Sequence, residues 1–359
     1  MKKRFILGLA ALAALALTGC QKDLVVNQVP EETPIAFGTY LGRDAATKAE
    51  VLNLGKLKEY GFGVYAYYHV GNWQNDASLV ANFMSNEKVD YDETNSRWKY
   101  TNVKYWPQIV SDEATQKKIS FFAYAPYNSN TTYVASSTTG EPTITVSKGT
   151  DHTYATVGST MTSLKNLTSQ NLVDGKVHFN FKHAMSKVGI SIQAKDQLGN
   201  SLGSNSSITV TSLSIKFSNV YKTATLNLGS GDLNCSDDAS NKEDFTLSLT
   251  SLSNNAVINN ANSKVTNNES DYLMLVPQEN ISLTINVSYT IKTTDSNLPV
   301  NNQDISFSYT VTNNTNTITI EKGKAYNLAL TLGLNAIEFC AKVTDWETPI
   351  DIPQNGITL

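Results

Sequence analysis

Apolar and polar residues alternate with a period of two along most of the chain, a pattern typical of β-strands with one buried face. The first such segment is 35–41, in which Ile35, Phe37 and Leu41 share one face. Further strands are expected at 61–68, 118–126, 177–181, 186–193, 208–217, 223–228, 245–249, 272–276, 281–291, 305–311, 317–320, 325–332 and 337–343. Short strands separated by Asn-, Ser-, Asp- and Gly-rich turns predict an all-β chain of sandwiches or barrels. A short helix is expected within 163–172.

The first residues are read as an export signal. Three basic residues, 2–4, precede an apolar run from Phe5 to Leu17, and the run ends at Leu17-Thr18-Gly19-Cys20. A basic region and a short apolar core are typical of a secretory signal peptide, and small residues before a cysteine match the bacterial lipobox. We therefore predict a lipoprotein signal peptide over 1–19, with Cys20 acylated, palmitate included, and the body held at the outer membrane. The alternative is an ordinary signal peptide with a chance cysteine.

The length of 359 residues is sufficient for two domains of typical size. Strands pattern well on both sides of His183, so we predict an N-terminal β-sandwich domain over 49–183 and a C-terminal one over 184–359. Residues 20–48 are read as a tether plus the first strand, a possible propeptide. The net charge of −4 provides no basic field for nucleic acid.

No catalytic constellation, metal site or cofactor motif is found in the sequence, which favours a protein that is not an enzyme. The histidines are His69, His152, His178 and His183, and none lies in HExxH. GxSxG, GxGxxG, P-loop and CxxC motifs are absent. The acidic groups Asp90, Asp92, Glu93, Asp237 and Asp238 are read as solvated loop residues rather than a calcium site.

Cys235 and Cys340 remain if Cys20 carries lipid. A disulfide and two free thiols both stay open, because sequence alone does not show whether their Cα atoms approach each other.

Aromatic residues gather in two stretches of the first half. They are Tyr65, Tyr67, Tyr68 and Trp73, then Trp98, Tyr100, Tyr105 and Trp106. Exposed aromatics can stack on sugars, but aromatics on alternating strands are more often core residues. The core interpretation is favoured.

Seven motifs, in this order, resemble the fimbrillin-like (Mfa-like, type V pilin) proteins of Bacteroidota. They are Tyr60–Tyr67, Val103–Pro107, Lys118–Tyr127, Phe179–Val188, Met274–Gln278, Gly323–Leu328 and Ala341–Trp346. The resemblance implies two transthyretin-like β-sandwich domains in tandem and export as an outer-membrane lipoprotein. It also implies assembly with other fimbrial subunits after a trypsin-like, often Arg-specific, protease removes the first strand.

The residues around the first strand fit that step. Arg43 and Lys48 follow it in a polar stretch, a plausible exposed cleavage site. Loss of the strand would bare a trough that another strand can complete. The C-terminal tail alternates again, with Ile350, Ile352, Ile357 and Leu359 as candidate donor side chains. The alternative is a tail folded on its own domain.

The sequence therefore predicts a structural or adhesive subunit of a surface fimbria, with a possible host or bacterial surface ligand. The alternative function is a monomeric outer-membrane lipoprotein that binds a glycan or host protein through Trp73 and Trp98.

Overall fold

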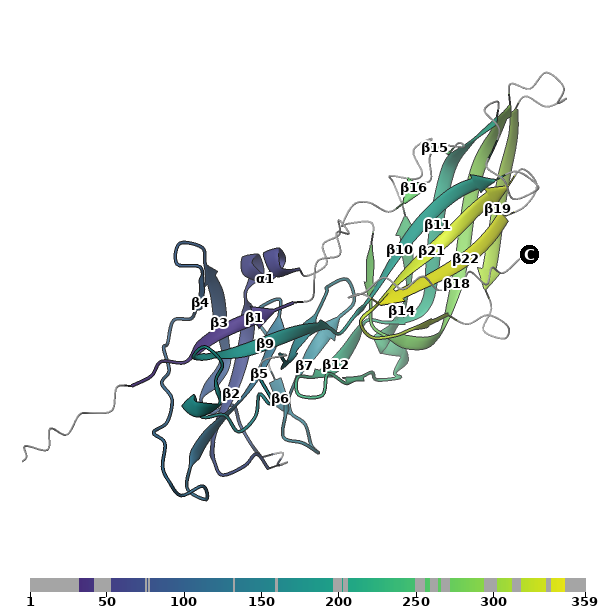
Figure 1. Cartoon of the computed structure of the whole chain (residues 1–359). Coiled ribbons are helices and arrows are strands. Elements are labelled where there is room, and N and C mark those ends of the chain that lie inside the picture. The colour runs from purple at the N-terminus through teal and green to yellow at the C-terminus, as the bar shows by residue number, and fades with distance from the viewer. Residues whose placement is uncertain are drawn as a thin grey trace, which may run out of the picture. The chain divides into compact units, whose positions relative to one another are not determined.

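Figure 1 shows the fold in a computed structural model. It describes residues 32–41, 53–74, 76, 78–131, 133–158, 161–195, 202, 206–248, 256–258, 264–265, 272–293, 302–311, 318–333 and 337–345. The described residues from Thr33 onward belong to one compact unit. None of their helices is long and apolar enough to cross a bilayer. Cys20, Arg43, Lys48, Ile350, Ile352, Ile357 and Leu359 lie outside the described residues.

The first half of the chain builds a seven-stranded sheet. Its strand order is β1 (Ala36–Tyr40), β9 (Lys176–His183), β8 (Thr153–Val157), β5 (Lys117–Ala125), β2 (Phe62–Val70), β3 (Met84–Asp92) and β4 (Arg97–Lys99). Neighbouring strands are antiparallel except β1 and β9, which are parallel. The α-helix α1 (Leu54–Tyr60) follows the gap after β1, and the Asn53 side chain caps it by accepting from the Lys56 N–H at 2.9 Å.

A second sheet of four strands combines segments from both sides of His183. Its order is β13 (Leu233–Asn234), β12 (Thr223–Asn227), β7 (Pro142–Ser147) and β6 (Tyr133–Ala135). Strands β12 and β13 were assigned to the second domain from sequence, yet β12 pairs with β7 of the first. The boundary near His183 and the tandem-domain organisation stay predictions.

The remaining strands form two further sheets. One contains β16 (Lys264–Val265), β10 (Ser186–Lys195), β21 (Lys324–Gly333) and β22 (Ile337–Asp345), with β17 (Leu273–Leu275) also paired to β10. The other contains β14 (Lys242–Ser248), β11 (Ser206–Tyr221), β18 (Gln278–Thr293) and β19 (Asn302–Val311), with β15 (Ala256–Ile258) on β11 and β20 (Ile318–Ile320) on β18.

Buried apolar side chains gather in three clusters. One cluster joins β10 and β21 to β11 and β18, so these two sheets enclose a common core. A second joins β1, β2, β5 and β9, and a third lies where β2 and β5 meet β7 and β12. The prediction of an all-β sandwich protein is confirmed.

The short helix expected within 163–172 is the 3-10 helix Ser169–Asn171. The residues before it bond to β5 instead. The Ile119 N–H donates to the Leu167 carbonyl, and the Phe121 N–H donates to the Leu164 carbonyl, each at 2.9 Å. A second 3-10 helix spans Ala239–Asn241.

Candidate functional site

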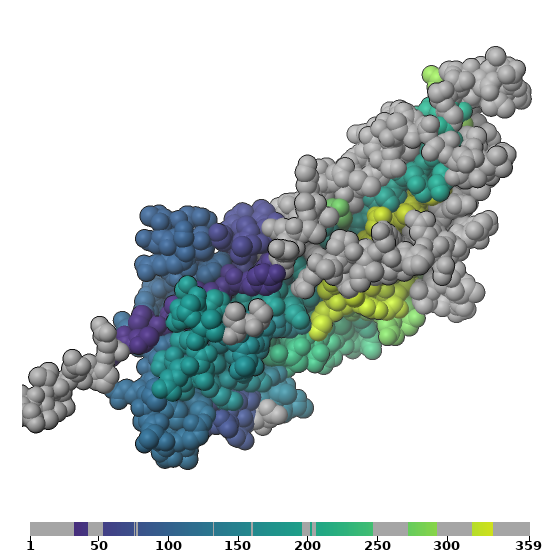
Figure 2. Space-filling view, in the orientation of Figure 1, coloured from purple at the N-terminus to yellow at the C-terminus, as the bar shows by residue number. Residues whose placement is uncertain are grey.

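The first strand lies at the edge of the seven-stranded sheet and is the feature on which the predicted function depends. Its register on β9 runs from Ala36 opposite Lys176 to Tyr40 opposite Asn180. Figure 1 shows β1 beside β9, and the purple atoms of the strand reach the surface in Figure 2. On this strand Ile35, Phe37 and Leu41 are buried, as the alternation predicted.

Phe37 occupies a cage of aromatic rings. Its ring stacks on Phe179 of β9 at a centroid distance of 5.4 Å and meets Phe121 of β5 edge-on at 5.9 Å. Phe62 and Tyr100 complete the cage at 6.1 Å and 5.5 Å. Such ring pairs add to the stabilisation from burial alone, so Phe37 is the main apolar anchor of the strand.

Polar groups hold the strand from the side away from β9. The Trp98 indole Nε1–H donates to the Thr39 hydroxyl at 2.9 Å, and the Tyr100 hydroxyl donates to the Ile35 carbonyl at 2.9 Å. The Ile35 N–H donates to the Lys104 carbonyl at 2.8 Å. Burial raises the pKa of Tyr100, so its hydroxyl stays protonated and remains a donor at neutral pH.

The outward face of the strand carries a glycine that accommodates a histidine ring. A Cβ atom placed on Gly38 would lie 2.5 Å from Cε1 of His178, the residue paired with it on β9. The imidazole Nε2 lies 2.7 Å from Oδ1 of Asp174. This hydrogen bond lowers the pKa of Asp174 and holds the ring over the glycine.

We call the surface around β1 the first-strand groove. It is lined by Phe62, Trp98, Tyr100, Phe121, His178 and Phe179. The sequence indicated Trp98 and Tyr100 as members of an aromatic cluster, but it did not predict that they contact the first strand. The contact between Gly38 and His178 carried no sequence signal.

The other predicted aromatics mainly belong to the core. Tyr65, Tyr67 and Trp106 are buried, and Trp73 packs edge-on against Tyr67 at 5.1 Å. Tyr105 is the exception, since 45% of it is exposed.

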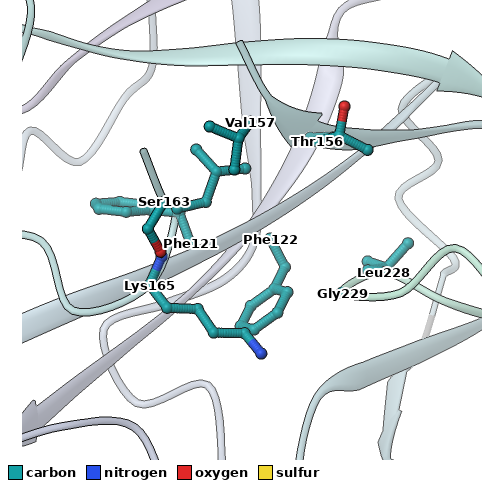
Figure 3. Close-up of a pocket in the computed structure, with 10 residues that line it drawn as sticks. Phe121, Phe122, Thr156, Val157, Ser163, Lys165, Leu228 and Gly229 are labelled. Atoms are coloured by element: carbon teal, nitrogen blue, oxygen red, sulfur yellow. The ribbon is translucent and has the colours of Figure 1, made fainter. Parts of the chain in front are cut away.

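A cavity of about 180 Å³ lies between β5 and β8, where these strands diverge (Figure 3). Its walls include Phe122, Val157 and Lys165. The Lys165 ammonium pairs with Glu141 and lies 5.4 Å from the centroid of the Trp73 ring. The polar part of the wall is thus engaged in internal contacts.

The titratable groups do not assemble into a catalytic or metal site in the described part of the chain. His183 and His178 contact different carboxylates: Nδ1 of His183 lies 3.0 Å from Oδ1 of Asp151, and Nε2 of His178 contacts Asp174. Among the described residues no three His, Cys, Asp or Glu side chains converge as metal ligands.

The acidic residues and the cysteine are engaged individually. Asp90 and Asp92 lie in β3 rather than in a loop, with Lys88 and Lys99 beside them. Cys235 is a free, half-buried thiol, and burial raises its pKa. The side chain of Cys340 is outside the described residues.

Comparison with known proteins identifies the family. The profile of the fimbrillin-like family matches residues 55–346. Fimbrium subunit Fim1C of Phocaeicola vulgatus is 29% identical over 222 residues, covering 58% of this chain and 55% of that protein. The chain thus spans about half the length of that relative. A crystal structure of a fimbrial protein from Bacteroides vulgatus covers 87% of this chain and 99% of its own, with 23% identity and a TM-score of 0.61. That likeness shows a shared fold, and the profile match over most of the sequence shows that the chain belongs to the fimbrillin-like family, whose members are fimbrial subunits and not enzymes.

Proposed function

We propose that the chain is a structural and adhesive fimbrial subunit that joins its neighbours by strand addition. Export as a lipoprotein through Cys20 would place it at the outer membrane. A protease cut after Arg43 or Lys48 would then release the first strand, and a strand from another subunit would fill the groove. Family membership supports the fimbrial role, and the geometry of the first strand supports the assembly step.

The single observation that carries the proposal is the position of β1. It is an edge strand of five residues, followed by two basic residues in the polar segment 42–49. Loss of β1 would expose the edge of β9 with which β1 now pairs, together with the aromatic cage around Phe37. An exposed edge beside an apolar trough is a template for an incoming strand.

Limited trypsin digestion of the purified lipid-free chain tests this proposal. We expect a cut after Arg43 or Lys48 by N-terminal sequencing, followed by SDS-resistant ladders. A variant with both Arg43→Gln and Lys48→Gln is the matched control and should stay monomeric under the same digestion. Ladders from the double variant, or a clean cut that leaves monomers, would contradict proteolysis-triggered strand addition.

The anchor is tested separately. Cells fed labelled palmitate should label the wild-type chain and not a Cys20→Ser variant. A labelled Cys20→Ser variant would refute acylation at this residue and leave the strand mechanism standing.

A monomeric glycan-binding role receives less support from the contacts. The indole N–H of Trp98 is engaged with Thr39, and Trp73 packs against Tyr67 and Phe122. Both tryptophans thus contribute to internal packing, which is the more common role of aromatic residues on alternating strands.

A further inference from the structure

The cavity between β5 and β8 is built from four pieces of the chain that converge on one wedge. The two strands pair at only two positions, the last two of β5, and then diverge. The segment 163–165 lies beside β5 in this wedge, because the Phe121 N–H donates to the Leu164 carbonyl at 2.9 Å. Leu228 and Gly229, which follow β12, form a further part of the wall (Figure 3).

The volume of the cavity is suited to a ligand of one ring. It measures about 180 Å³, and a cavity of about 150 Å³ is enough to hold a benzene molecule. Cavities that hold drug-sized ligands are larger, roughly 300–1,000 Å³. Most of the wall is apolar and consists of Phe121, Phe122, Ala155, Val157, Leu164 and Leu228. A compact ligand with apolar surface therefore fits the cavity.

The polar groups of the wall are held in place and still have hydrogen-bonding capacity. In the described part of the chain the Lys165 ammonium bonds to Glu141 alone, which leaves two of its three N–H donors. The Ser163 hydroxyl accepts from the Lys165 N–H at 2.9 Å, so its own O–H can donate. The Thr156 hydroxyl donates to the Asn180 carbonyl at 3.0 Å and can still accept.

The ion pair keeps the polar side of the cavity neutral overall. Glu141 lies against two wall residues, Lys165 and Gly229, and its side chain is only 7% exposed. A ligand carboxylate would meet the Glu141 carboxylate beside the ammonium, and a ligand cation would meet Lys165. Like charges in such proximity select against a partner, so the cavity is suited to an uncharged ligand.

We propose that this cavity binds one neutral pyranose ring of a glycan. The inference rests on the proposed adhesive role of the subunit and names the class of ligand. A pyranose is a single six-membered ring whose C–H groups can pack on Phe122 and Leu228 while its hydroxyls meet Lys165 and Ser163. A purely apolar ring would cover these donors without supplying acceptors, which is costly.

Titration of neutral sugars onto the uncut, lipid-free chain tests the proposal. The probes are the methyl pyranosides of glucose, galactose, mannose and N-acetylglucosamine, and binding is followed by saturation-transfer NMR. At least one probe should bind with a Kd of about millimolar order, as expected for a ligand of so few atoms. The uronate counterpart of the bound sugar should bind at least about tenfold more weakly, because its carboxylate meets Glu141.

A paired substitution tests whether Lys165 holds the sugar. Glu141→Gln with Lys165→Met removes the ammonium without leaving a buried unpaired carboxylate, and binding should weaken at least about tenfold. Lys148→Met with Glu243→Gln is the matched control, because this ion pair also lies beside an aromatic ring but is not part of the cavity wall. The control variant should bind the sugar like wild type.

Ser163→Ala tests the same wall without disturbing the ion pair. Loss of this hydroxyl should weaken binding about fivefold. This variant decides the question if the paired substitution does not fold. Unchanged binding by Ser163→Ala would refute the contact between the sugar and this hydroxyl.

The outcomes separate the sugar site from the assembly mechanism. The inference would be overturned if none of the four neutral probes bound, if the uronate bound as tightly as the neutral sugar, or if the Glu141 and Lys165 pair and its control gave the same affinity. All of these measurements use the uncut chain. Ladders after trypsin would therefore still report on strand addition if the sugar site failed, and sugar binding would stand if the ladders failed.

Discussion

Replacing Phe37 by alanine should strongly destabilise the uncut chain. Its side chain is buried, and four aromatic rings surround it. Deleting a phenylalanine from such a site costs about 3–5 kcal/mol of unfolding free energy, since transfer and cavity terms add. The loss should be confined to the part of the protein that depends on β1, because the C-terminal core contains none of these rings.

Urea denaturation followed by tryptophan fluorescence measures this effect, since Trp98 and Trp106 report on the surroundings of β1. Tyr40→Ala is the matched control, an aromatic deletion on the same strand at an exposed position. It should shift stability by about 0.5 kcal/mol or less. If Phe37→Ala and Tyr40→Ala gave the same midpoint, the strand would not be anchored by its aromatic cage.

Three further changes have expected results. Trp98→Phe removes the hydrogen bond to the first strand and should lower the unfolding free energy by about 0.5–1.5 kcal/mol in urea titrations, whereas an unchanged midpoint would refute this contribution. Burial lowers the pKa of His152 to about 4, so the unfolded chain binds the proton at a higher pH than the folded chain does. The unfolding free energy should therefore fall between pH 6.5 and pH 4, by up to about 1.4 kcal/mol per pH unit. His152→Gln should reduce this slope. Gly231→Ala should destabilise more than Gly149→Ala in thermal melts, because both have positive φ but only Gly231 has a ring within 2.0 Å of the added Cβ; equal melting temperatures would argue against this packing.

Strands that face a core on one side were the part of the fold that the sequence could predict. In β9 the residues Val177, Phe179 and Phe181 are buried and alternate with less buried ones, which is the pattern that the period of two detects. Strand β3 was missed because only Met84 and Val89 of it are buried. A bulge in its pairing with β2 shifts the register and breaks the alternation.

Strand β7 was missed although its residues carry the signal. Ile144 and Val146 are buried and alternate with threonines, and Pro142 stands at the first position, where a strand tolerates it. The short helix expected within 163–172 is limited to Ser169–Asn171. The residues before it bond to β5, a tertiary contact that local sequence does not encode.

The groove itself was predictable only in its parts. Alternation identified the buried face of β1, and composition identified the aromatics. Which rings meet Phe37 depends on the parallel pairing of β1 with β9, two strands far apart in the sequence. The contact between Gly38 and His178 depends on the same register, and a one-residue shift would abolish it.

The energetics of the groove explain why cleavage would have to precede exchange. Ile35, Phe37 and Leu41 together contribute roughly 5–9 kcal/mol of gross burial. An incoming strand must replace these contacts before exchange can be downhill. While β1 remains covalently attached through residues 42–52, its effective concentration at the groove is of millimolar order. A cut in that segment reduces this concentration to that of a free peptide, which can diffuse away. A peptide of the candidate donor tail, residues 349–359, should consequently enter the groove when added after trypsin and be excluded when trypsin is omitted. Equal entry in both cases would show that the tether does not control the groove.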